Sequence, residues 1–463
     1  MKPFTRILIV LGAMALAACS GTNSLDGVEP PAGPNPVGQL QVLHASPDAP
    51  AVNVLLDGVE ILSGVDYKTA SDERFLIAGI HSVQVDAILP GGATATVFGP
   101  ADVNFAADTI TTISAVGPVS IPLDVSVETK PDTESAAAAR IFVLHATSGI
   151  SLGLGEEALP VDVYVDAWSE PNAAVGDSMP FTFSFKETLG PLELAPGDYQ
   201  IRVTLEGSLD PVYDSGRVSL AAGDDLTLAA VPNVSGGPAA VTLLALGAGG
   251  SGDILDVNTP TGLRVGHLSP DTDPVDIVVN GGVYLDDVPY PAVTGIAPLA
   301  ADTYAVSITT ADGGAVAFGP ADLTLEAGTW YTVLATDVNA NLTVDILADD
   351  ARPVALYGKV RIYHASPTAQ NVDIYVTGPE DDINDIDTPT LPNVPFGANT
   401  GYIPLDEGDY KVTVAPAGTK TEAIVAMVPV SAGGVYTAIA IDDPDTGGFA
   451  AILLEDVLDV VDD

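Results

Sequence analysis

Four of the five histidines in this chain stand at the same place in a repeated pattern. They are His44 in "LHASPDAP", His145 in "LHATSG", His267 in "GHLSPDTDP" and His364 in "YHASPTAQ". In three of these copies a serine follows two residues later, as Ser46, Ser269 and Ser366. An imidazole beside a serine can act as a general base, and a neutral imidazole is also a common metal ligand. The pattern is therefore either a reactive site present four times or a structural corner built four times.

The alternation of side chains around the histidine favours the structural interpretation. In "VRIYHASP", Val360, Ile362 and His364 fall on one face of an extended strand, and Arg361 and Tyr363 fall on the other. The histidine thus continues an apolar face just before a turn, where a neutral ring can bond two backbone groups. A metal site needs three or four converging ligands, and no acid recurs with the serine. We expect a structural role, with metal binding and serine catalysis as the alternatives.

The repeated pattern extends well beyond the histidine, which recurs at intervals of about 100 to 120 residues. Each copy has a strand that ends at the histidine, a second strand such as "VDIYV", and a turn into a later strand such as "LAPGDYQIRV". The segments are short, β-branched and alternating, with Gly, Pro, Asp or Asn between them. About seven strands per copy predict an all-β chain of four antiparallel, immunoglobulin-like β-sandwich domains, with small β-barrels as the alternative. The expected domains are residues 38–132, 138–250 with an insertion, 261–352 and 357–463, each with its own core.

Three tyrosines recur at one turn of this pattern. Tyr199 and Tyr410 lie in "GDY" turns, and Tyr304 stands at the same place in the third copy. These turns resemble a tyrosine corner, in which the phenol bonds back to nearby backbone and locks the turn. The first copy has His81 at this position.

The N-terminus is typical of an export signal. Lys2 and Arg6 precede an apolar stretch at 7–18 that is too short to span a bilayer. The residues "LAAC" at 16–19 resemble a bacterial lipobox, which implies cleavage before Cys19 and a diacylglycerol on its sulfur. Cys19 is the single cysteine of the chain, so no internal disulfide can form. We expect a signal peptide at 1–18 and a lipidated tether at 19–37, with an ordinary signal peptide as the alternative.

The residue after the lipobox cysteine indicates in which of the two bacterial membranes the protein is anchored. In lipoproteins of this kind an aspartate there resembles an inner-membrane retention signal, and this chain has Ser20. The outer membrane or cell surface is therefore the expected location, with the inner membrane or periplasmic face as the alternative.

The charge of the chain excludes some partners. There are 15 Lys and Arg against 62 Asp and Glu, which gives a formal net charge of −47. Such a surface repels nucleic acid and anionic lipid headgroups and favours cations or basic partners. The loop "GPEDDINDIDTP" offers four carboxylates that could bind calcium weakly, with a solvated acidic loop as the alternative and no other cofactor expected. These candidates are Asp381, Asp382, Asp385 and Asp387.

The "HASP" start, the "VDIYV" strand and the "L-x-x-G-x-Y" turn together resemble one bacterial family. It is the family of the domain of unknown function 4397, found in exported and lipid-anchored proteins. The second copy departs from the family pattern, because "HATSG" lacks the proline and an insertion follows it. The resemblance implies a fold but no activity.

These features predict a lipid-anchored, non-catalytic protein of the envelope or cell surface. Its domains would form an interaction or adhesion module for an unknown protein or polysaccharide. The first alternative is a structural spacer of the envelope. The second is a hydrolase in the insertion of the second copy, where "GISLG" at 149–153 matches the G-x-S-x-G motif with Ser151 as nucleophile.

The lipid anchor makes the first prediction. Replacing Cys19 by alanine removes the sulfur that carries the diacylglycerol, so labelling of the protein with a fatty-acid analogue should be lost. Ser20→Ala leaves the sulfur in place and should keep the label. Labelling of the Cys19→Ala variant at the wild-type level would contradict a lipid at this residue.

Overall fold

The structure, a computed structural model, describes residues 36–119, 123–133, 135–149, 159–170, 174–176, 178–311 and 314–456. In this part of the chain the elements are strands, apart from three short 3-10 helices, η1 (Pro90–Gly92), η2 (Asn339–Asn341) and η3 (Ile383–Asp385). None of the helices described is long and apolar enough to cross a membrane. The protein is all-β, as predicted.

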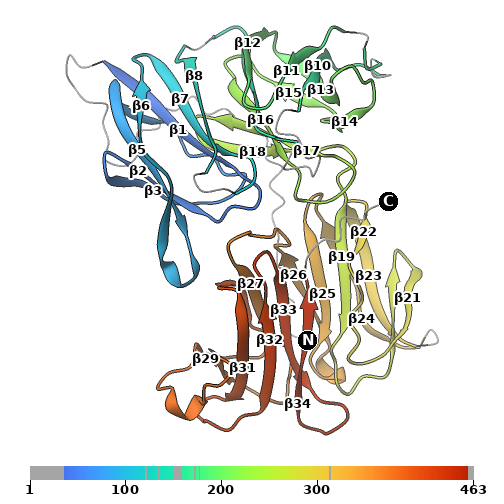
Figure 1. Ribbon diagram of the computed structural model, residues 1–463. Helices are drawn as coiled ribbons and strands as arrows, with labels where there is room; N and C mark the ends of the chain where they lie inside the picture. Colours follow the sequence, from blue (N-terminus) through green and yellow to red (C-terminus); the bar gives the residue numbers. More distant parts are fainter. Residues whose placement is uncertain are drawn as a thin grey trace.

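The described strands fall into four units along the chain (Figure 1). Unit 1 contains β1 (Val37–Ala45), β2 (Val52–Leu56), β3 (Val59–Val65), β4 (Arg74–Ile77), β5 (Gly79–Ile88), β6 (Thr94–Phe105), β7 (Thr109–Val116) and β8 (Val125–Pro131). Unit 2 contains β9 (Ala139–His145), β10 (Val161–Ala167), β11 (Phe181–Phe183), β12 (Thr188–Leu194), β13 (Gly197–Leu205), β14 (Pro211–Asp214), β15 (Val218–Leu220), β16 (Asp225–Pro232), β17 (Val241–Gly247) and β18 (Gly250–Ile254).

The second half of the chain repeats the arrangement. Unit 3 contains β19 (Thr261–His267), β20 (Val275–Val279), β21 (Gly282–Val288), β22 (Ala297–Leu299), β23 (Asp302–Thr310), β24 (Val316–Leu325), β25 (Trp330–Thr336) and β26 (Thr343–Asp349). Unit 4 contains β27 (Gly358–His364), β28 (Val372–Thr377), β29 (Leu391–Val394), β30 (Asn399–Leu405), β31 (Gly408–Pro416), β32 (Ile424–Val430), β33 (Val435–Asp442) and β34 (Phe449–Glu455).

Each unit is a β-sandwich of two sheets. In unit 1 the sheet β4-β1-β7-β8 faces the sheet β3-β2-β5-β6, and unit 4 repeats this order as β30-β27-β33-β34 and β29-β28-β31-β32. Buried side chains from both sheets form one core, such as Leu40 and Val42 of β1 with Val52 and Val54 of β2. The described sheets are open at their edges, so the sandwich prediction is confirmed over the barrel alternative.

Each sandwich contains one parallel strand pair, which the antiparallel prediction did not include. The histidine strand pairs in parallel with a later strand of the same sheet: β1 with β7, β9 with β16, β19 with β25 and β27 with β33. A parallel pair needs a long crossover connection. Here the strands of the opposite sheet and one edge strand of the same sheet lie between the two in sequence and supply it.

The histidine strand is buried on both of its faces. In β27 the inner residues Val360 and Ile362 belong to the core of unit 4. The outer residues Arg361 and Tyr363 are also buried, with 1% and 0% of their surface exposed. The predicted alternation of faces is therefore confirmed. The second face is covered by the neighbouring unit.

Units 3 and 4 pack together through these outer faces, below the pair formed by units 1 and 2 (Figure 1). Leu268 and Leu334 of unit 3 form one buried cluster with Tyr363 and Ile439 of unit 4. Units 1 and 2 share a similar cluster, and the Tyr67 hydroxyl of unit 1 donates to the Pro232 carbonyl of unit 2 at 2.5 Å.

Two arginines cross the interface between units 3 and 4 in opposite directions. Arg264 of unit 3 lies 2.6 Å from the Asp456 carboxylate that follows β34. Arg361 of unit 4 lies 2.6 Å from the Asp349 carboxylate at the end of β26. Each side chain in these two pairs is at most 3% exposed. Two guanidinium groups and two carboxylates balance in charge, which a buried ionic cluster requires.

The same arginines also bond hydroxyl groups within their own sheets. The Nε of Arg264 donates to Thr332 at 3.1 Å, and the Nε of Arg361 donates to Thr437 at 3.0 Å. The Tyr402 hydroxyl donates to Asp456 at 2.9 Å. The cluster is therefore nearly saturated with hydrogen bonds, which offsets part of the cost of burying charge.

The second prediction concerns this cluster. Asp456→Ala removes one carboxylate and leaves two buried guanidinium groups opposite a single remaining carboxylate, so it should lower the free energy of unfolding by about 3–5 kcal/mol. Urea unfolding of the whole chain measures this. The control is Asp198→Ala, which removes the partner of the exposed Arg217 and should have a much smaller effect, because water screens an exposed ion pair. Equal effects of the two substitutions would contradict a structural role for the cluster.

Candidate functional site

The four repeated histidines lie at the rim of each sandwich, where the histidine strand ends. They are fully buried, with at most 1% of their surface exposed. The Nε2 of His44 lies 2.9 Å from the carbonyl oxygen of Pro50, and that of His364 lies 2.7 Å from the carbonyl oxygen of Gln370. In unit 2 the His145 Nε2 is 2.7 Å from the carbonyl oxygen of Leu159. The ring thus connects the end of the first strand to the start of the second.

The second ring nitrogen is also used in two of the units. A carbonyl can only accept, so Nε2 carries the hydrogen and Nδ1 is the acceptor. The Nδ1 of His145 accepts from the Thr147 backbone N–H at 3.4 Å, and that of His364 accepts from the Ser366 backbone N–H at 3.4 Å. Neither ring has a nitrogen left for a metal ion or for a serine hydroxyl.

The other two rings have fewer partners. The Nδ1 of His44 has no hydrogen bond, and in His267 neither nitrogen has one of good geometry, although the ring lies near the backbone of Thr272 and Asp273. The Ser366 hydroxyl donates to Asp442 rather than to the imidazole. In unit 4 the serine is therefore not paired with the imidazole.

Burial keeps the four rings neutral. Desolvation is the largest cause that lowers the pKa of His44, to about 4, and the backbone hydrogen bond to Pro50 opposes it. Burial likewise lowers the pKa of His145, His267 and His364. In units 2 and 4 a protonated ring would also present its Nδ1–H to a backbone N–H. An aromatic ring packs edge-on near each histidine, such as Tyr67 at 6.2 Å between centroids from His44.

The predicted tyrosine corner has the expected geometry. The hydroxyl of each tyrosine donates to the carbonyl oxygen four residues earlier, with distances of 2.8 Å, 2.7 Å and 3.1 Å for Tyr199, Tyr304 and Tyr410. The chain passes from one sheet to the other at this point, for example from β30 to β31. The bond therefore fixes the crossing between the two sheets.

His81 makes the same corner in unit 1. Its Nε2 lies 2.8 Å from the carbonyl oxygen of Ile77, which is again four residues earlier. Its Nδ1 lies 2.7 Å from the Asp57 carboxylate. Burial lowers the pKa of His81, but the hydrogen bonds to Asp57 and Ile77 raise it more, so the net shift is upward. From the sequence, His81 was placed at the position of the tyrosines, but no role was predicted for it.

The acidic loop does not bring its four carboxylates together. Asp382 caps η3 by accepting from the Asn384 backbone N–H at 2.8 Å, and Asp381 accepts from the Gly378 backbone N–H at 2.8 Å. Lys420 donates to the carbonyl oxygen of Ile383 at 2.6 Å and also bonds that of Ile386. An ammonium group thus occupies the carbonyls that a cation would use.

Metal ligands do not cluster elsewhere in the described ranges either, where no group of three His, Cys, Asp or Glu could hold an ion. Weak binding of calcium by Asp381, Asp382, Asp385 and Asp387 stays a prediction. Cys19 and Ser151 lie outside the described residues.

The third prediction follows from the opposite pKa shifts in unit 1. The folded pKa of His44 lies below the unfolded value near 6.5, so neutral His44 stabilises the fold fully above that pH. This stabilisation is lost as the pH falls toward 4. His44→Phe should lower the free energy of unfolding by about 1–3 kcal/mol at pH 8 and by less at pH 5.

His81→Phe is the matched control in the same unit. Because the pKa of His81 is raised on folding, its contribution is present below pH 6.5 and is lost as the pH rises. The difference in urea midpoint between this variant and the wild type should therefore grow on acidification. If both variants differ from the wild type by the same amount at every pH, the neutral, buried assignment of His44 is wrong.

Comparison with known proteins assigns the chain to a family. The family model described as "Domain of unknown function (DUF4397)" matches residues 38–151, 261–375 and 358–463. Each match begins at or next to a histidine strand, and the first two extend past the histidine of the following unit. No curated protein matches the chain. Since the matched segments cover most of the sequence, the chain belongs to the family of the domain of unknown function DUF4397.

Proposed function

We propose that this protein is a lipid-anchored, non-catalytic interaction module of the bacterial outer membrane or cell surface. The family has no assigned activity, so the proposal rests on the sequence of the N-terminus and on how the units are arranged. The partner we infer is a protein or polysaccharide of the envelope, and membrane lipid is bound through Cys19. Nucleic acid is not a partner on grounds of charge, since the chain carries −47.

The observation that carries the proposal is that the linker between units 3 and 4 folds back onto unit 1. The Arg352 guanidinium lies 2.6 Å from the Asp66 carboxylate and donates to the Ala49 carbonyl at 2.9 Å. The backbone N–H of Ala355 donates to the Asp48 carbonyl at 2.8 Å. A structural spacer gains length only when its units lie end to end. Contacts between the linker and unit 1 hold the four units together instead, so that loops of several units are presented on one compact particle.

The chemistry of the described rim supports a non-catalytic role. The rings of His145 and His364 are saturated by backbone groups. Catalysis by serine needs a free ring nitrogen within hydrogen-bond reach of a hydroxyl. The hydrolase alternative is the one placed at Ser151, and in units 2 and 4 these rings give it no further support.

The fourth prediction is a binding measurement. Residues 20–463, incubated with isolated envelopes, should bind saturably, and binding should weaken as salt is added, because an acidic surface attracts basic groups that salt screens. Sedimentation of the envelopes measures the bound fraction. Calcium and a chelator, added in parallel, test whether the carboxylates of 378–389 take part.

Two outcomes would favour the alternatives. Binding that never saturates, at low salt as at high salt, would favour the structural spacer. Labelling by a fluorophosphonate probe that is lost in Ser151→Ala would favour the hydrolase.

A further inference from the structure

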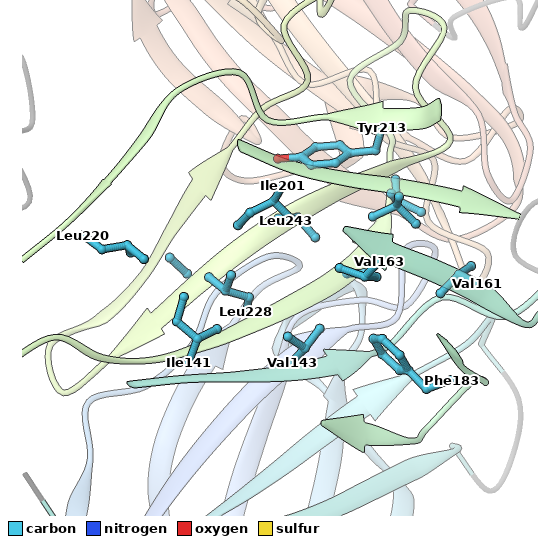
Figure 2. Close-up of a cluster of buried hydrophobic side chains, with 14 of the residues drawn as sticks. Ile141, Val143, Val161, Val163, Phe183, Ile201, Tyr213, Leu220, Leu228 and Leu243 are labelled. Carbon is cyan, nitrogen blue, oxygen red and sulfur yellow. The ribbon is translucent and has the colours of Figure 1, made fainter. Parts of the chain in front are cut away.

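A cavity of about 190 Å³ lies between the two sheets of unit 2. Every residue that lines it has an apolar side chain except His145. Figure 2 shows side chains of this core, including Ile141 and Val163, which come from opposite sheets and point into the space between them. An apolar cavity of roughly 150 Å³ is known to stay dry and to take up a small hydrocarbon. The cavity in unit 2 is larger than that.

At one position that borders the cavity, unit 2 has a smaller side chain than unit 4. In unit 4, Phe449 of β34 pairs with Asp442 and packs against the core. In unit 2 the corresponding position, opposite Pro232, is Val241. A smaller cavity of about 30 Å³ in unit 4 lies beside Val360 and Ile362, and Phe449 is not among the residues that line it. The larger cavity of unit 2 extends to the position that Phe449 occupies in unit 4.

The lining residues indicate a long and narrow shape. On β10 and the residues just before it they run from Leu159 to Val165, a length of roughly 20 Å at about 3.3 Å per residue. On the paired strand β13 they run from Ile201 to Leu205. An elongated apolar space fits an extended chain better than a compact ring.

The most exposed side chain that lines the cavity lies at one of its ends. Leu205 lines the cavity and is nevertheless 41% exposed. It pairs with Val161 across β10 and β13, at the end of the sheet where His145 bonds the Leu159 carbonyl. The polar groups of the cavity are therefore gathered at the end that has access to solvent. The opposite end, around Ile141 and Val165, has only apolar walls.

We propose that unit 2 binds a single hydrocarbon chain in this cavity, with its methyl end toward Ile141 and its head group at the Leu205 end. Water gains nothing by entering, because the walls offer it no hydrogen bonds and the His145 ring is already satisfied. A chain of methylene groups restores the dispersion contacts that the empty space lacks. This inference goes beyond the proposed function, because it concerns the interior of one unit and not the surface that meets a partner.

The test uses residues 20–463 and methyl cis-parinarate, an uncharged fluorescent hydrocarbon chain. An uncharged probe is needed because the protein carries a formal charge of −47. We expect saturable fluorescence enhancement at one probe per protein, and displacement of the probe by dodecanol. Val241→Phe introduces the side chain that unit 4 has, and it should weaken binding at least tenfold.

The matched control is Val425→Phe. It makes the same change at a position on β32 that is 52% exposed, and it should bind the probe like the wild type. Thermal unfolding shows whether Val241→Phe is folded, and a filled cavity should leave its Tm unchanged or higher. Ala230→Leu, which adds volume from the neighbouring strand β16 of the same sheet, is the second variant if Val241→Phe does not fold.

Two results would overturn the proposal. One is the absence of saturable binding in the wild type, and the other is equal binding by the wild type and by a folded variant with a filled cavity. A further arm compares the protein acylated at Cys19 with residues 20–463. Weaker probe binding by the acylated form would identify the protein's own acyl chain as the occupant, and equal binding would identify a free lipid. Binding to envelopes can fail while the probe still binds, so this test and that of the proposed function are independent.

Discussion

The strand that carries the repeated histidine has no exposed face, and the rest of the structure follows from this. Its inner residues fill the core of its own sandwich, and its outer residues are as deeply buried. Central parallel strands are generally covered on both sides. In the described part of the chain the only helices are three short 3-10 helices, and the second side is covered by another unit. Unit 1 therefore packs against unit 2, and unit 3 packs against unit 4.

The two pairs cover the outer face with different chemistry. Arg264 and Arg361 stand three residues before their histidines, and in units 1 and 2 the same position holds Gln41 and Phe142. Gln41 bonds the Gly247 carbonyl at 2.9 Å, whereas the arginines need the two aspartates of the partner unit. Around Phe142 the charged groups are instead Lys130 and Arg140, which lie over its ring and share the Asp225 carboxylate at 3.4 Å. The two pairs of units thus bury different sets of charges at their interfaces.

Part of this arrangement could be predicted from the sequence and part could not. The alternation in "VRIYHASP" gave the two faces correctly, and the "GDY" turns gave the corner. The corner of His81 could also have been found, since Ile77 and His81 have the spacing of Ala195 and Tyr199. The parallel pairing could not be predicted from the local sequence, because the side chains of parallel and antiparallel strands alternate with the same period. The cavity depends on volumes summed across two sheets, and a single difference such as Val241 against Phe449 does not reveal it without the register.

The stretch "LHASPDAP" makes one contact inside its own unit and another with the linker that follows unit 3. Inside the unit, His44 bonds the Pro50 carbonyl and holds the loop against the core. Outside, the same loop receives Arg352 at the carbonyls of Pro47 and Ala49. In unit 4 the corresponding loop is held by Asp442, which accepts from Ser366 and from Thr368. One internal bond is thus kept in each of these copies while the outer side of the loop varies. Duplication of a unit with this property produces a common scaffold whose loops are free to acquire different contacts, and a protein that recognises partners needs such loops.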